Sequence, residues 1–439
     1  MRNIKEMILE FLKNEVVSAV GCTEPVAIAL ACAKASELIN LSDYRQIDSI
    51  ILIISPNIFK NAMGVGIPNT DEIGINIAAA LGIVHKGSEE QLNIFQNVTE
   101  ADVTCAKNLI SNGKLKVELK DTDKKIYIEV VIKAKSEYTR AIIEYRHNNF
   151  VLLEKNGEIL LNLDQDNRIH NNKVQTCPCQ EICDFTIKDI VDEVEKLSYE
   201  ELRFLEEGLS MNMKIANAGI SEPLGVGMGY QLQDSMNKNM MDNSYINRAI
   251  ALVAAASDAR MKGIPLPVMS SNGSGNMGLV QSIPLYQYKE DFNIDQLSLL
   301  KALALSHIIT GYIKHYTGRL SPLCGAATAA GIGLSSAYCL LMNGGYNGIK
   351  GAIKNMIGDV SGMICDGAKS GCALKSATSV STAYFSAILA CSNRIIPNKN
   401  GIIEENLEET IKHMGELSAS MSQADKIILS IMQKINRES

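Results

Sequence analysis

The spacing of apolar residues predicts that most of this chain is helical. In residues 3–18 the apolar side chains recur every three or four positions, as on one face of an amphipathic helix. A proline at position 25 suits the first turn of a second helix, because a first-turn residue needs no amide hydrogen. The same reasoning, with breaks at Gly and Pro, predicts helices at 25–39, 71–81, 99–111, 198–217, 247–261 and 296–316.

A different pattern occupies part of the first half. Residues 48–56 form a β-branched run that predicts a strand. Four more strand-like segments, separated by turn residues, predict an antiparallel meander with one solvated face: 114–118, 125–133, 138–146 and 149–154. Asn156-Gly157 is typical of a hairpin turn after the last of them.

Together these elements predict an α+β protein. We expect a mostly α-helical body, formed by residues 1–44 and 186–439, which carries the cysteine motifs described below. We expect residues 45–185 to form an inserted, smaller α/β domain that contains the antiparallel sheet. A chain of 439 residues is long enough for two or three such domains.

Composition narrows the possible partners. The formal net charge is -7, and no basic patch is interleaved with aromatic residues, so neither nucleic acid nor an anionic membrane surface is expected as a partner. Residues 324–345 lack charge, but they are mostly Ala, Gly, Ser and Thr, which indicates a buried helix instead of a membrane span. The abundance of small residues predicts close helix packing and would suit a homodimer.

Eleven cysteines raise the question of their redox state. The number is odd, the chain is long, and its N-terminus is a charged amphipathic segment without the apolar core of a signal peptide. These features indicate a reducing cytoplasm, in which the cysteines are free thiols, metal ligands or catalytic groups.

Four of these cysteines stand in motifs that combine glycine turns with helix starts. Cys365 and Cys372 lie in a glycine-interrupted segment, Cys324 precedes a small-residue helix whose dipole should favour the thiolate, and Cys22 also precedes a helix. Three cysteines can hold a 4Fe-4S cluster and leave one iron open to act as a Lewis acid. The alternative interpretation is that these cysteines are buried as small apolar residues.

A second group of cysteines, Cys177, Cys179 and Cys183, falls in a polar linker. Its density suggests zinc or a cluster, but no partner group with regular spacing follows it. Linker thiols without a metal are the simpler interpretation.

A loop at 270–276 is rich in Ser, Asn and Gly, which exposes amides and hydroxyls that can bind a carboxylate or a phosphate. It is neither a P-loop nor a dinucleotide fingerprint. The candidate substrate-binding residues are Ser270, Ser271, Asn272, Gly273, Ser274 and Asn276. No pyridoxal phosphate site is predicted, although Lys369 and Lys375 are available lysines.

Taken together, the motifs at 21–25, 270–276, 323–331 and 364–375 resemble the L-cysteine desulfidase family, which is related to the α-chain of iron–sulfur L-serine dehydratases. The resemblance covers nearly the whole chain. It implies a pyridoxal-independent β-elimination in which L-cysteine gives pyruvate, ammonia and sulfide. It also implies that Cys324, Cys365 and Cys372 hold the cluster, while some relatives use Cys22 in place of Cys372.

The base that removes the α-proton stays open at this point: Cys22, Lys369 and Lys375 are the candidates. L-serine as the substrate, by the same mechanism, is one alternative. A protein that keeps the cluster and binds or senses an amino acid without turnover is another.

Overall fold

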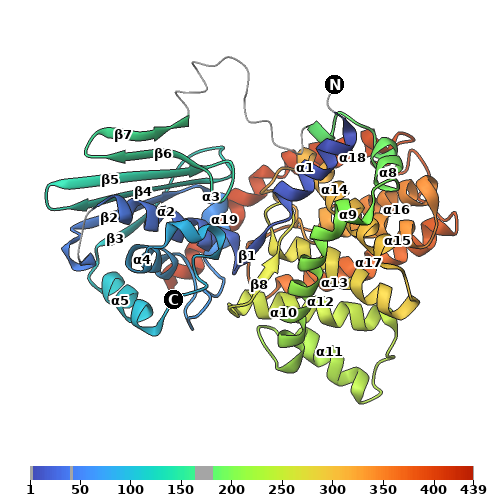
Figure 1. Ribbon diagram of the computed structural model, residues 1–439, viewed down its shortest axis with the longest axis horizontal. Coiled ribbons are helices and arrows are strands. Elements are labelled where there is room, and N and C mark those ends of the chain that lie inside the picture. Colours follow the sequence, from blue (N-terminus) through green and yellow to red (C-terminus); the bar gives the residue numbers. More distant parts are fainter. Residues whose placement is uncertain (1–2, 40–42, 164–180, 439) are drawn as a thin grey trace.

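The computed structural model describes residues 3–39, 43–163 and 181–438. In these residues helices predominate, and the strands form a six-stranded sheet and a two-stranded ribbon, which confirms the predicted α+β class. Figure 1 shows two lobes side by side, one built on the larger sheet and one made of helices. No helix of the described residues is long and apolar enough to cross a membrane.

The sheet of the smaller lobe has the order β3-β2-β4-β5-β6-β7. Its strands are β2 (Ser49–Ile54), β3 (Leu115–Leu119), β4 (Tyr127–Ala134), β5 (Glu137–Glu144), β6 (Phe150–Lys155) and β7 (Glu158–Asn162). The strands from β4 to β7 are antiparallel neighbours, and the predicted turn joins β6 to β7 with Asn156 and Gly157 both at positive φ.

One part of the predicted meander is wrong. Strand β3 does not pair with β4; it pairs in parallel with β2, which lies between them. The chain passes from β2 to β3 through three helices: α3 (Pro56–Ala62), α4 (Ile75–His85) and α5 (Glu100–Ser111). A helical crossover of this kind returns the chain in the same direction, whereas a short turn would reverse it.

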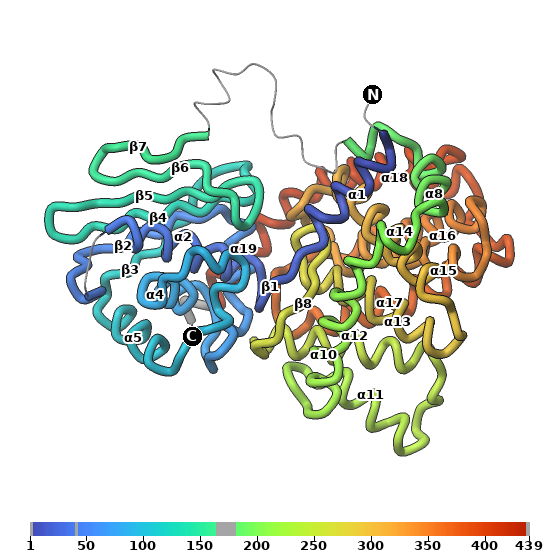
Figure 2. Tube along the Cα trace, in the orientation of Figure 1, coloured from blue at the N-terminus to red at the C-terminus, as the bar shows by residue number. Residues whose placement is uncertain are grey.

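Helix α2 (Thr23–Leu38) belongs to the core of this sheet lobe. It packs on α4, β4 and β5, and nearly all of its side chains are buried. We therefore propose that the boundary between the lobes lies between β1 (Ser18–Val20) and α2, and not near residue 44. Helix α19 (Ser422–Glu438) also reaches the smaller lobe, where it contacts α3; Figure 2 shows the red end of the chain beside the blue and cyan segments.

The helical lobe has α15 (Ala329–Leu341) near its centre, packed on four other helices. Small residues permit this packing: a Cβ atom at Gly333 would lie 2.4 Å from the carbonyl oxygen of Ser306. The remaining helices of this lobe are α1 (Ile4–Glu15), α8 (Ile187–Val194), α9 (Tyr199–Leu202), α10 (Glu206–Ser221), α11 (Met228–Asn237), α12 (Tyr245–Lys262), α13 (Gly275–Phe292), α14 (Gln296–Thr317), α16 (Gly345–Val360), α17 (Cys372–Cys391) and α18 (Leu407–Ser420). The helix predicted at 198–217 is interrupted by a 3₁₀ turn at Arg203–Leu205.

A short ribbon marks the junction of the lobes. Strand β1 pairs in antiparallel fashion with β8 (Pro267–Met269), with Ser18 opposite Met269 and Val20 opposite Pro267. Both strands lead directly into predicted functional segments, because Cys22 follows β1 and the 270–276 loop follows β8. The ribbon therefore brings the start of α2 next to that loop, between the two lobes of Figure 1.

Candidate functional site

Two of the cysteine motifs pair through their backbones. The amide of Cys324 donates to the carbonyl of Met363 at 2.8 Å, and the amide of Cys365 donates to the carbonyl of Pro322 at 2.6 Å. Leu323 and Ile364 form the antiparallel bridge between these bonds. This small pairing places Cys324 and Cys365 next to each other, although they are far apart in the sequence.

Cys372 lies close to both of these residues, at the first position of α17. The tight turn that precedes it includes Gly367 at φ +99°, whose carbonyl lies 3.7 Å from the Cys372 sulfur. Ionisation of Cys365 or of Cys372 would raise the pKa of Cys324, so the three thiols lie within electrostatic reach of one another. The three predicted cluster cysteines therefore converge.

Cys22 joins the group from the other lobe. It packs in a small apolar cluster with Val65 and Met261, and the partly buried Cys372 lies against the same cluster. Burial raises the pKa of the Cys22 thiol to about 12, and the positive charge of Arg260 only partly offsets this effect.

Burial also favours the protonated form of the Cys324 thiol. It raises the pKa of this thiol to about 12, with further increases from Cys365 and Cys372, so the predicted stabilisation of the thiolate by a helix dipole is wrong. A hydrogen bond from the backbone at Ala327, just before α15, lowers this pKa but does not outweigh the burial. Buried thiols that raise one another's pKa release their protons when a metal cation compensates the charge.

Among the described residues, no group of three or more His, Cys, Asp or Glu side chains could hold one metal ion.

The two predicted lysines share one carboxylate. Lys375 donates to Asp366 at 2.6 Å and to the carbonyl of Ile364 at 2.9 Å, while Lys369 forms an ion pair with the other oxygen of Asp366. Burial, and then the charge of Lys375, lowers the pKa of Lys369, and the nearby thiols oppose this effect. Lys375 is thus bonded to the segment at 364–372, which contains Cys365 and Cys372 and is called the cysteine loop below. Lys369 is the lysine whose pKa is shifted towards that of a base.

The 270–276 loop uses most of its own polar groups to hold its shape. The hydroxyl of Ser270 donates to the carbonyl of Val17 at 2.6 Å, and the amide of Asn272 donates to the carbonyl of Glu15 at 3.0 Å. Ser271 Oγ lies 2.9 Å from Nδ1 of His307, whose pKa is lowered to about 3 by burial, so this imidazole is neutral. The hydroxyls of Ser270 and Ser271 are therefore part of the scaffold.

Arg260 is the residue that the sequence analysis missed. Its buried guanidinium donates to Asn276 Oδ1 at 3.1 Å and to the carbonyl of Gly21 at 3.0 Å, so it joins the starts of α13 and α2. Neither helix has a side-chain cap, because the N-cap residues Cys22 and Ser274 make no capping hydrogen bond. The signal in the sequence was an arginine within the alanine-rich, buried helix α12.

Two buried carboxylates, those of Glu24 and Glu15, lie near basic side chains. Glu24 accepts from Asn61 at 3.1 Å and lies 3.8 Å from Nε2 of His147, which comes from the β5–β6 turn. Glu15 lies 3.0 Å from an Nη atom of Arg319. Burial alone would raise the pKa of Glu24, but His147 and then Arg260 outweigh it, so this pKa is lowered and the carboxylate is charged.

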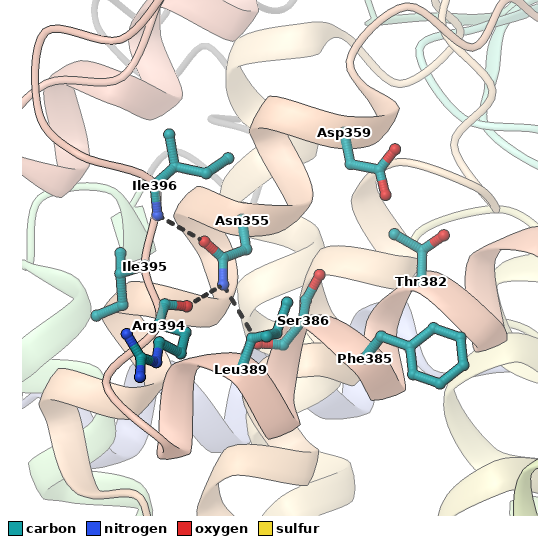
Figure 3. A pocket seen from close by; sticks show the side chains of 9 residues that line it. All are labelled: Asn355, Asp359, Thr382, Phe385, Ser386, Leu389, Arg394, Ile395 and Ile396. Atoms are coloured by element: carbon teal, nitrogen blue, oxygen red, sulfur yellow. Dashed lines mark hydrogen bonds between the residues drawn. The ribbon is translucent and has the colours of Figure 1, made fainter.

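Two other features lie away from these residues. A pocket of about 490 Å³ is formed between α16, α17 and residues 394–396, where Asn355 holds the chain by hydrogen bonds to Arg394 and Ile396 (Figure 3). Its residues on α17 begin at Thr382, about 15 Å along the helix from Cys372. Cys183 contacts the carbonyl of Tyr312 at 4.0 Å, and Cys177 and Cys179 lie outside the described residues.

The fold and this thiol-lined junction define a two-lobed α+β protein in which the buried Arg260 joins the starts of α2 and α13. The chain belongs to the serine dehydratase alpha chain family, whose model matches residues 89–430, and this confirms the family relation predicted from the motifs. It is 47% identical to a UPF0597 protein of Alkaliphilus oremlandii over 98% of both chains. It is 44% identical to a UPF0597 protein of Clostridioides difficile, over 98% of this chain and 100% of the other.

Proposed function

We propose that this protein is a pyridoxal-independent lyase that eliminates sulfide from L-cysteine, giving pyruvate, ammonia and sulfide. Membership of the serine dehydratase alpha chain family supports a dehydratase-like lyase activity. The observation that carries the finer proposal is the convergence of Cys324, Cys365 and Cys372 beside Cys22 and Lys369.

The three converging thiols would hold a 4Fe-4S cluster. Such a cluster, when bound, supplies an open iron that polarises the β-leaving group as a Lewis acid. The thiolate of cysteine is a softer ligand for iron than the hydroxyl of serine, which favours L-cysteine as the substrate.

The substrate carboxylate would bind between the starts of α2 and α13. The N-cap residues of these two helices make no side-chain capping hydrogen bond, so the positive dipole ends face this corner, and the guanidinium of Arg260 bonds to Gly21 and Asn276 there. In this proposal the 270–276 loop would bind the carboxylate through backbone amides and Asn276, because the hydroxyls of Ser270 and Ser271 are engaged with Val17 and His307.

The α-proton would pass to Lys369. Burial and the charge of Lys375 lower its pKa towards the range that a base needs, although its ion pair with Asp366 favours the charged form. Lys375 would hold Asp366 and the cysteine loop in place. Burial raises the pKa of Cys22 to about 12, so as a free thiol it stays protonated at neutral pH and does not accept the α-proton. The aminoacrylate that leaves would hydrolyse in water.

The decisive experiment uses protein reconstituted anaerobically with iron and sulfide, with L-cysteine and L-serine assayed in parallel. We expect equimolar sulfide and pyruvate from L-cysteine, lost on exposure to air and lost in Cys324→Ala. Cys105→Ala, in helix α5 of the other lobe, is the matched control and should keep the activity. Pyruvate from serine alone would instead make the protein a serine dehydratase.

The absence of any product, with the cluster intact by absorbance, would refute the enzymatic proposal and leave amino-acid binding or sensing. The proposal also includes a cytoplasmic location and a homodimer, as predicted from the sequence. Sedimentation of the reconstituted protein measures the oligomeric state, and a monomer at micromolar concentration would contradict the homodimer.

A further inference from the structure

A lysine of the sheet lobe reaches the backbone of the cysteine loop. Lys60 lies in α3 with 1% of its surface exposed, and its Nζ atom donates to the carbonyl oxygen of Cys365 at 3.0 Å. The ammonium group also donates to Asp425 at 2.6 Å. A buried lysine is tolerated when its charge is paired and its donors are used, as both are here.

The carboxylate partner comes from the opposite end of the chain. Asp425 lies in the first turn of α19, where the helix dipole stabilises a negative charge, and its second oxygen accepts from Asn57 at 3.2 Å. Of the apolar residues on this helix, Leu429 is buried, whereas Ile427 and Ile431 are 62% and 51% exposed. The buried ion pair adds a polar connection between α19 and α3.

The cysteine loop also touches the backbone at Lys60. Gly367 has φ +99°, and a Cβ atom there would lie 2.3 Å from the carbonyl oxygen of Lys60. On its other side, the amide of Cys365 is held by the carbonyl of Pro322 in the helical lobe. The backbone of Cys365 is therefore held by the helical lobe at its amide and by the sheet lobe at its carbonyl.

We propose that Lys60 and Asp425 are positioning residues for Cys365: the ion pair docks the C-terminal helix and fixes the carbonyl of this cysteine. The inference rests on the proposed function only in giving Cys365 the role of a cluster ligand. Lys60 and Asp425 touch neither substrate nor metal in this arrangement. They act through the backbone of the residue that does.

The test measures alkylation of individual thiols in the metal-free, full-length protein by mass spectrometry. We expect Asp425→Asn and Lys60→Met to increase the alkylation rate of Cys365 about tenfold, the equivalent of one lost hydrogen bond. Cys324 and Cys105 serve as internal references, and their rates should stay within twofold of wild type. Equal rates for Cys365 in all proteins would overturn the proposal.

A double variant separates positioning from general stabilisation. Lys60→Met with Asp425→Leu replaces the buried pair by apolar side chains, an exchange that often preserves stability. If the pair positions Cys365, this variant should keep the wild-type melting temperature, show the faster alkylation of Cys365, and lose the absorbance of the reconstituted cluster faster in air. Faster alkylation of every thiol alike would instead mean that the pair only stabilises the fold.

Because the alkylation arm needs neither cluster nor substrate, its outcome is independent of the proposed lyase activity. If the protein is inactive but the variants still show selectively faster alkylation of Cys365, this inference stands and the proposed function is refuted. If the protein is active and alkylation of Cys365 is unchanged in the variants, the function stands and this inference is refuted.

Discussion

Glu24→Gln probes the charge network that connects the two lobes. The substitution keeps the shape of the side chain and removes its negative charge. Glu24 is buried, accepts from Asn61 at 3.1 Å, and lies 3.1 Å from the hydroxyl of Thr23. A glutamine can accept from Asn61 with its oxygen and donate to the Thr23 hydroxyl with its nitrogen, so both hydrogen bonds can persist.

The expected loss of stability therefore comes from removing the negative charge of Glu24. Removing one partner of a buried ion pair typically costs about 3–5 kcal/mol, because the remaining charge is left without compensation. Here the positive charge is that of Arg260, which keeps its bonds to Gly21 and Asn276, while His147 lies 3.8 Å from the carboxylate. Because those bonds remain, we expect the lower end of the range, about 3 kcal/mol of unfolding free energy at pH 7.

The sign of the pH dependence follows from the pKa of Glu24, which is lowered in the folded protein. A carboxyl with a depressed pKa contributes stability above its unfolded pKa and loses it as the pH falls through the folded pKa. The difference between wild type and variant should thus be complete at neutral pH and should shrink below about pH 4.

Urea unfolding of both proteins at several pH values measures this difference. Glu118→Gln, which removes an exposed partner of Lys116 on β3, is the matched control and should change the free energy by less than about 0.5 kcal/mol. A Glu24→Gln protein within 1 kcal/mol of wild type at pH 7, or a difference that persists unchanged at pH 3, would refute the reasoning.

Two further predictions concern the helical lobe. Gly219→Ala should destabilise it by about 2–3 kcal/mol in urea unfolding, because the new Cβ would lie 2.0 Å from the carbonyl oxygen of Ala255. The control Gly348→Ala, whose nearest neighbours lie at 3.6 Å, should be neutral or stabilising by about 0.5 kcal/mol. Equal effects of the two substitutions would contradict this reasoning. Cys391 should react with iodoacetamide with a midpoint near pH 7, because hydrogen bonding with the Cys339 thiol, 3.6 Å away, lowers its pKa to about 7. Cys339→Ala should move that midpoint to higher pH, and an unchanged profile would exclude the hydrogen bond as the cause.

Local patterns predicted the individual elements well. The helix predicted at 247–261 is α12 (Tyr245–Lys262), and that at 296–316 is α14 (Gln296–Thr317). Such segments are long and have clear end signals, including Gly263 at a left-handed φ after α12. The hairpin at Asn156-Gly157 follows from turn chemistry that is equally local.

The pattern of apolar and polar residues did not predict which lobe each element belongs to. Helix α2 is buried on nearly all sides, so its sequence has no polar face that would indicate which neighbour it packs on. The parallel partner of β3 depended on three intervening helices folding over the sheet. Both outcomes are set by which distant surfaces fit together.

The same division holds for the site. By itself the sequence determined which thiols stand next to tight turns and helix starts, and its motifs determined the family, because both depend on residues that are close in the chain. The tertiary structure alone decided that Arg260 joins α2 to α13, that Lys375 is tied to Asp366, and that Lys60 and Asp425 meet behind Cys365. These pairings bring charges together in a buried interior, and burial and charge pairing are properties of the folded chain.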